Sequence, residues 1–244
     1  MLSGIAQNHH IAEITTLGTD GSRYIYGIGA YNNKQKEITF SVGSTQIGNH
    51  SNNGNLGNIA TQGLVDYLPS DNSLSNTKGI DNYYSNTETP GYAHSFLLTS
   101  VLTPDYVDAD NVRGPSDGDY GGYTKFKYRR IKDFKWRTPI ETNKATFSEG
   151  LKSDYTDDKG NVIYGEKDVY YLDSVITKNY IAVFHKSLRE DALGVNGENG
   201  GFSLSQRQLK LDSISLFSKR DKKTPLKRVH FEYTYELCKN VPNN

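Results

Sequence analysis

Short stretches of the chain alternate apolar and polar residues with a period of two, which is typical of half-buried β-strands. In the clearest stretch, 226–235, the apolar positions are Val229, Phe231, Tyr233 and Tyr235. A charged turn separates this stretch from 208–217, which is also rich in Leu, Ile and Phe. Because two strands joined by a polar turn form a hairpin, 208–235 predicts a β-hairpin.

The same two arms occur twice more. The stretch 171–175 is followed by 181–184, and 98–101 is followed, after a long loop, by 123–128. The first arm of every copy reads Leu-x-Ser-[Val/Ile], at Leu98–Val101, Leu172–Val175 and Leu211–Ile214. Its Leu and its Val or Ile are three residues apart, and a regular strand would place them on opposite faces.

Two interpretations of this spacing stay open. A β-bulge at the Thr-Ser or Asp-Ser pair would return the apolar residues to one face and bend the strand. Alternatively, both faces of the strand are partly buried. The copies begin 74 and 39 residues apart, at 98, 172 and 211, so no solenoid of constant repeat length is predicted.

The beginning of the chain predicts a further hairpin at 11–31, because Asp20 and Gly21 favour the positive φ angles of a tight turn between two strands. A third short strand is expected at 37–42. The composition then changes to Asn, Ser, Gly and Thr. We therefore divide the chain into an N-terminal β-hairpin region, a polar insertion and a repeated β-hairpin region, at 1–42, 43–91 and 92–244.

The overall composition also favours strands. The chain has 244 residues, with 18 Tyr and 9 Phe against a single Met and a single Trp, and aromatic rings pack well on pleated surfaces. A short helix at 58–67 is the one helical feature expected. The predicted fold is mainly β, one continuous domain of antiparallel twisted sheet built from consecutive hairpins with long polar loops and little helix.

Charge and cysteine content exclude several classes of function. Lys and Arg (28) balance Asp and Glu (28), so no net field attracts nucleic acid or an acidic membrane. The single Cys238 excludes an internal disulfide and a Cys-rich zinc site. No export signal is visible in the given sequence, and it has no apolar run of about 18 residues, so no membrane insertion is expected. Both ends of the sequence lie close to predicted strands, so we expect a segment of a longer polypeptide.

One loop is a candidate for a cation. Five aspartates crowd the loop 105–119, and calcium prefers several carboxylate and carbonyl oxygens. They are Asp105, Asp108, Asp110, Asp117 and Asp119. If Asp108 is position 1 of an EF-hand, Arg113 falls where the loop requires Gly. A solvated acidic loop is therefore preferred to a calcium site.

Other candidate sites have plainer explanations. The stretch 125–137 interleaves basic and aromatic residues, but alternation predicts an exposed basic face over a buried aromatic face, not a platform for nucleic acid. Glu166 and Asp168 share one strand, whereas catalytic carboxylates of glycosidases face each other across a cleft, so a solvated strand edge is expected. Cys238, in the same predicted hairpin as His230, is interpreted as structural. The histidines lack metal-ligand spacing, and no phosphate-binding loop or nucleophile elbow occurs.

The recurring hairpins resemble the YD-repeat (Rhs-type) shells and the related cocoon proteins of insecticidal toxin complexes. Four segments are similar, more narrowly, to parts of very large Rhs-like Bacteroidetes surface proteins, at 11–31, 170–184, 191–201 and 225–244. The resemblance implies a long spiralling β-sheet that is exported and that encloses or displays another segment. It implies no catalytic residue here, because the family's toxic C-terminal segment and its aspartate self-cleavage motif are not found.

These observations favour a non-catalytic structural or encapsulating β-scaffold segment of a large exported or cell-surface protein. Its expected partners are the rest of its own polypeptide and an encapsulated C-terminal segment or a surface glycan, without a cofactor. The alternative is a carbohydrate-binding β-sandwich. Its stacking residues would be exposed aromatic side chains, namely Tyr83, Tyr84, Tyr92 and Trp136.

Overall fold

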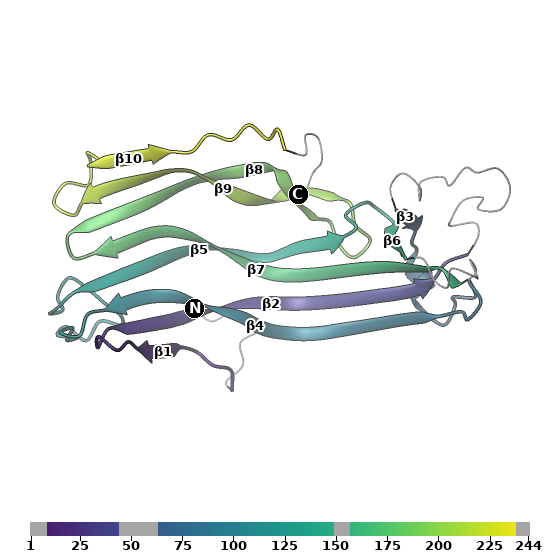
Figure 1. Cartoon of the computed structure of the whole chain (residues 1–244), viewed down its shortest axis with the longest axis horizontal. Helices are drawn as coiled ribbons and strands as arrows, with labels where there is room; N and C mark the ends of the chain where they lie inside the picture. The colour runs from purple at the N-terminus through teal and green to yellow at the C-terminus, as the bar shows by residue number, and fades with distance from the viewer. Residues whose placement is uncertain (1–8, 44–62, 149–156, 238–244) are drawn as a thin grey trace.

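The computed structural model describes residues 9–43, 63–148 and 157–237, and these form a single antiparallel sheet of ten strands (Figure 1). The strands are β1 (Ile14–Leu17), β2 (Arg23–Ser41), β3 (Leu64–Asp66), β4 (Tyr84–Leu102), β5 (Tyr123–Thr138), β6 (Lys144–Ser148), β7 (Lys159–Thr177), β8 (Tyr180–Val195), β9 (Phe202–Ser218) and β10 (Lys227–His230). The prediction of a mainly β fold built from consecutive hairpins is confirmed.

The polar insertion departs from its prediction. A helix was expected at 58–67, but Leu64–Asp66 form β3; residues 58–62 lie outside the described part of the chain. The helical element that the structure describes from end to end is the 3-10 turn Pro69–Asn72. β4 begins at Tyr84, inside the expected insertion, because Ser85–Pro90 continue to pair with β2. Polar composition did not prevent pairing, since main-chain hydrogen bonds form the ladder whatever the side chain.

Six long strands form three two-stranded ribbons, β2/β4, β5/β7 and β8/β9. At one end of the molecule, here the hairpin end, β4 of the first ribbon pairs with β5 of the second through Ser100–Leu102. Toward the opposite end, here the core end, β2 takes the place of β4 and pairs with β7 through Asn32–Ser41. Each of these two ribbons therefore makes about half a turn between its ends. The cause is the right-handed twist of strands, which accumulates over 16 to 19 residues.

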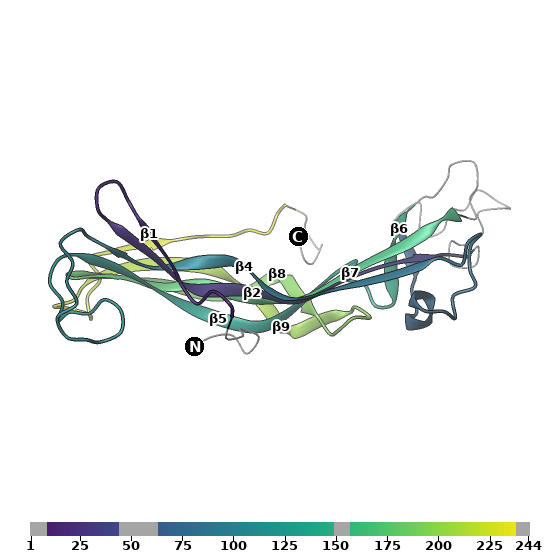
Figure 2. The ribbon, with the colours of Figure 1, turned by 90° about the horizontal axis from the view of Figure 1, so that it is seen from below.

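The sheet is one layer thick over most of its length, as the edge-on view in Figure 2 shows. The whole chain exposes 14836 Å² to solvent, whereas a compact monomer of 27.3 kDa would expose about 11,000 Å². Most residues of the long strands β7 and β9 are half-buried on the faces of the sheet. The two packed sheets of a β-sandwich, as in the alternative interpretation, are therefore not seen among the described residues.

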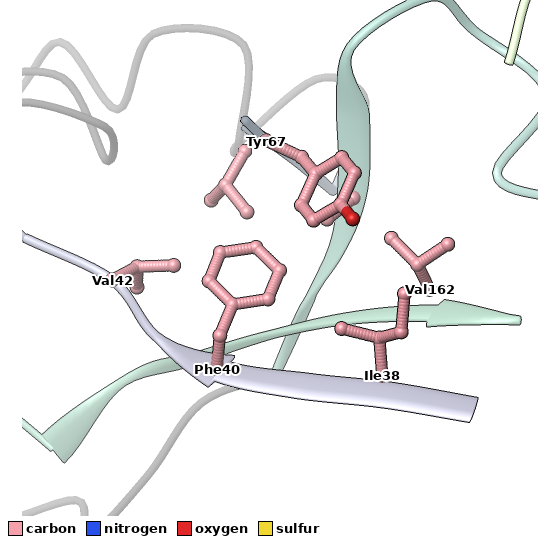
Figure 3. Packing of buried hydrophobic residues seen from close by; sticks show 7 residues of the cluster. Ile38, Phe40, Val42, Tyr67 and Val162 are labelled. Atoms are coloured by element: carbon pink, nitrogen blue, oxygen red, sulfur yellow. The ribbon is translucent and has the colours of Figure 1, made fainter. Parts of the chain in front are cut away.

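The main core lies where β3 and β6 fold over β2 and β7 at the core end (Figure 3). It contains Ile38, Phe40, Val42, Val65, Tyr67, Ala145 and Val162. Phe40 is fully buried and its ring covers Gly160 on the neighbouring strand, where a Cβ would collide with it. A second, smaller cluster at the hairpin end joins Leu102, Tyr106 and Tyr123. The insertion thus contributes Val65 and Tyr67 to a core that its composition did not predict.

A β-bulge occurs in all three copies of the Leu-x-Ser-[Val/Ile] arm. The middle residue is the extra one each time, because Leu and Ser pair with consecutive residues of the partner strand. The extra residues are Thr99, Asp173 and Asp212. The bulge interpretation of the sequence spacing is confirmed.

A side chain from the returning arm binds each bulge. The donor stands three residues after the residue that pairs with Ser, and the acceptor is the backbone carbonyl of Leu. The three hydrogen bonds are Tyr128 Oη to Leu98 O (2.8 Å), Lys186 Nζ to Leu172 O (2.7 Å) and Tyr233 Oη to Leu211 O (2.9 Å). The repeat therefore has a structural unit that joins both arms.

The last strand is shorter than predicted. A strand was expected as far as Tyr235, but β10 ends at His230. In the other two copies the contact between the arms also stops at the Ser of the bulge, and the returning arm continues because the next strand of its ribbon pairs with it. Among the described residues β10 has β9 as its one partner, so it lacks the second strand that would extend it.

Candidate functional site

The acidic loop lies between β4 and β5 at the hairpin end and brings three of its five aspartates together. One carboxylate oxygen from each of Asp108, Asp110 and Asp119 lies within 4.8 Å of the others. Asp105 and Asp117 lie outside this group; Asp117 accepts a hydrogen bond from the Tyr123 hydroxyl at 2.5 Å. The loop folds into this shape because its aspartates accept hydrogen bonds from nearby backbone N–H groups.

Asp119 is the buried member, with 2% of its surface exposed, so the prediction of a solvated loop is wrong at this position. Its carboxylate accepts hydrogen bonds from the Tyr106 hydroxyl (2.6 Å), the Ser116 amide (2.8 Å) and the Ala109 amide (3.1 Å). The Tyr106 bond, followed by those from the amides, lowers the pKa of Asp119 below its usual value. Both carboxylate oxygens of Asp119 therefore already accept hydrogen bonds from within the loop.

A second polar cluster lies in the middle of the sheet. Asp168 of β7 is buried, and its carboxylate forms an ion pair with Arg130 Nη2 at 2.7 Å. Asn33 Nδ2 donates to Asp168 (3.2 Å) and to Asp133 (2.6 Å). The register of β2 and of β5 against β7 shifts at Asn33 and at 132–133, so these polar side chains occupy the region where the ribbons exchange neighbours.

This cluster corrects the interpretation of Glu166 and Asp168. A solvated edge was expected, but β7 is an interior strand paired on both sides. Glu166 accepts a hydrogen bond from the Tyr164 hydroxyl at 2.5 Å, and burial together with that bond raises the pKa of Tyr164. The Asp168 carboxylate is held by Arg130 and Asn33, so its environment is that of a structural contact.

The stretch 125–137 forms most of β5, and its basic residues are not uniformly exposed as predicted. Arg137 is 5% exposed and donates to the backbone carbonyls of residues 139, 141, 144 and 198. Its pKa is lowered by burial. Arg137 thus holds the loops of the core end together. Alternation in sequence could not find it, because alternation indicates which face of a strand a residue occupies and not which loop carbonyls fold around the end of that strand.

The four aromatic residues proposed for carbohydrate stacking are not gathered in one site. Tyr83, Tyr84 and Tyr92 are exposed, but Trp136 lies against Gly165, with Lys167 Nζ 5.7 Å from its ring centre. Trp136 belongs to β5 and Tyr92 to β4, and β2 and β7 lie between these strands here, a separation of about 14 Å across the sheet. The histidines do not join a metal-binding group in the part of the chain that is described, and Cys238 lies outside it.

Both edges of the sheet are open among the described residues. β1 and β10 are the outermost strands, and every residue of each is exposed. Beyond β10 the segment 232–237 has no strand pairing, although Tyr233 and Tyr235 still contact β9 and β8 through their hydroxyls. A groove of about 620 Å³ lies along this segment and is lined also by Arg189, Asp191, Leu209 and Lys210. The period-two pattern predicted strands at both edges of the sheet, but it did not indicate that these edges would lack a further strand.

No family model, curated protein or solved structure matches the chain. Within the described ranges, no helix is long and apolar enough to cross a membrane.

Proposed function

We propose that the chain is a non-catalytic structural or encapsulating segment of a large exported or cell-surface protein, built as a wall of β-ribbons. The observation that supports this most is the repeated lateral unit, in which a bulged arm and a returning arm join one ribbon to the next. Such a unit extends a sheet sideways and needs no closed core. The Rhs-like resemblance of the hairpins agrees with this role.

The chemistry of the polar clusters also supports a structural role. The buried carboxylates of Asp119 and Asp168 are bound by donors from within the sheet or its own loop. A catalytic acid or base needs an accessible position beside a substrate. The partners of this wall are the rest of its own polypeptide and the segment that the polypeptide encloses or displays.

An immunoblot of the producing cells tests this proposal. Antibodies against the chain should detect a polypeptide much larger than 27.3 kDa, in the surface or culture fraction. A 27.3 kDa species confined to the cytosol would overturn the proposal.

A glycan array with the purified chain tests the carbohydrate-binding alternative. We expect no retained glycan, since the exposed aromatic rings do not converge. Binding that is lost in Tyr92→Ala, while a matched variant at the distant Tyr120→Ala keeps it, would favour the alternative and contradict the scaffold function.

A further inference from the structure

The segment that follows β10 has the sequence of a strand without the pairing of one. The amide of Phe231 still donates to Asp212 O of β9 at 2.9 Å, but regular strand structure has ended at His230. Tyr235 has a φ of 52°, a left-handed conformation that is rare for a bulky residue and incompatible with a continuous strand. Phe231 and Tyr233 are 39% and 47% exposed. A segment with an alternating strand sequence therefore has an outer edge without a paired strand among the described residues.

The two preceding copies indicate what covers the equivalent edge. In each of them the Ser of the bulged arm pairs with one residue of the returning arm, and the next residue of the returning arm is a Phe. This Phe pairs on its other side with the Val or Ile of the next Leu-x-Ser-[Val/Ile] arm. The pairs are Phe126 with Val175 and Phe184 with Ile214. Phe231 holds the same position in the third copy, one residue after His230, the partner of Ser213. The register of its missing partner is thus fixed by two precedents within the chain.

We propose that the open edge of β10 and the segment 231–235 bind a strand with the Leu-x-Ser-[Val/Ile] pattern, which completes a fourth ribbon. Its Val or Ile lies opposite Phe231 and its Leu lies opposite Tyr233, as Leu211 lies opposite Lys186 in β8/β9. The bound segment is extended through Tyr235. This inference rests on the wall function and names the partner that the wall requires at this edge.

The partner is a strand from outside this chain. The pattern occurs three times in the sequence, and all three arms already pair on both sides in β4, β7 and β9. A second copy of the chain would offer the edges of β1 and β10, but neither strand has the pattern, and β1 pairs with β2 without a bulge. Main-chain pairing supplies the affinity of such an added strand, and alternate side chains supply its specificity.

A peptide that spans residues 207–218 is a suitable probe, because it contains the pattern and the register of β9. Labelled at its N-terminus, it should bind the purified chain saturably in fluorescence anisotropy, and a scrambled peptide should not. Hydrogen exchange should then slow at the amides of residues 230–235. Protection at 14–17 in place of 230–235 would overturn the proposal, because the peptide would have bound the other edge.

A pair of variants at Glu232 separates main-chain pairing from other contacts. Because the Phe231 amide faces β9, strand alternation turns the Glu232 amide toward the open edge. Glu232→Pro removes that donor and should weaken peptide binding about tenfold or more. Glu232→Ala keeps the donor and should bind normally. Equal binding by both variants would refute strand addition.

The results of the peptide experiments can be told apart from the result of the immunoblot, which tests the wall proposal. If the unliganded chain self-associates and its own residues 230–235 become protected without peptide, the partner is a second copy and the proposed pattern strand is wrong. If the peptide fails to bind, this inference fails while the immunoblot result stands. If the immunoblot finds a small cytosolic protein, the wall proposal fails whatever the peptide does.

Discussion

The contact of Lys186 with the bulge of β7 provides the sharpest test of the repeat unit. Its ammonium group donates to Leu172 O (2.7 Å), to the Asp173 carboxylate (2.8 Å) and to Phe184 O (2.8 Å). The side chain is only 5% exposed, although Lys is rarely buried without partners. We expect Lys186→Met, which keeps the apolar stem and removes these bonds, to destabilise the chain.

The magnitude follows from the exposure of the partners. Hydrogen bonds to a charged group contribute about 1.5–3 kcal/mol, and breaking a fully buried ion pair costs about 3–5 kcal/mol. Asp173, however, is 40% exposed and lies 3.7 Å from Arg129, so its carboxylate remains solvated and near a second cation. The expected loss for Lys186→Met is therefore about 2–3 kcal/mol.

A second substitution tests whether residue 186 has the role that its position in the repeat predicts, which is to donate to the Leu carbonyl of the bulge. Lys186→Tyr places at this position the residue that the other two copies have, and a hydroxyl there can donate to Leu172 O as Tyr128 does to Leu98 O. We expect it to recover most of the loss and to remain within about 1 kcal/mol of the parent chain.

Urea unfolding followed by circular dichroism measures these differences, provided that the denaturant dependence of the unfolding free energy is the same for all variants. Lys132→Met is the control, since Lys132 is 63% exposed and should change stability by less than about 0.5 kcal/mol. If Lys186→Met matched this control, or if Lys186→Tyr were as unstable as Lys186→Met, the bound bulge would not be a unit of the fold.

Three further predictions concern the core and the acidic loop. Phe40→Ala should cost about 3–5 kcal/mol in urea unfolding because Phe40 is fully buried, and a cost below about 1 kcal/mol would contradict the packing of β3 over β2. The hydrogen bonds to Asp119 lower its folded pKa below the ordinary value of 3.8, so the stability that they give is present at neutral pH and is lost as the pH falls below 3.8. Asp119→Asn should therefore flatten the acid limb when the urea midpoint is measured against pH. An unchanged slope would refute this. Millimolar calcium should leave the melting temperature unchanged, and a rise that Asp108→Asn abolishes would establish the calcium site instead.

Much of the local structure was readable from the sequence. Period-two alternation predicted the hairpins, and the three-residue spacing of Leu98 and Val101 indicated the bulge, because a strand can return two such residues to one face only by inserting an extra one. The turn at Gly21 was also readable, since its φ of 80° depends on the local residue. The separate strand expected at 37–42 was wrong, because residues 23–41 form the single strand β2 and pair with β4 across the expected boundary.

The tertiary structure decided what lies beside each strand. Alternation cannot tell that β4 and β2 exchange places along the ribbon, because that depends on twist accumulated over a whole strand. For the same reason Asp168 was expected at a solvated edge and lies buried in the middle of the sheet. The strand expected as far as Tyr235 ends at His230, since strand structure needs a partner that a residue's own sequence does not supply. The sequence by itself determined which segments can form strands, and the neighbours available in space decided how far each strand extends.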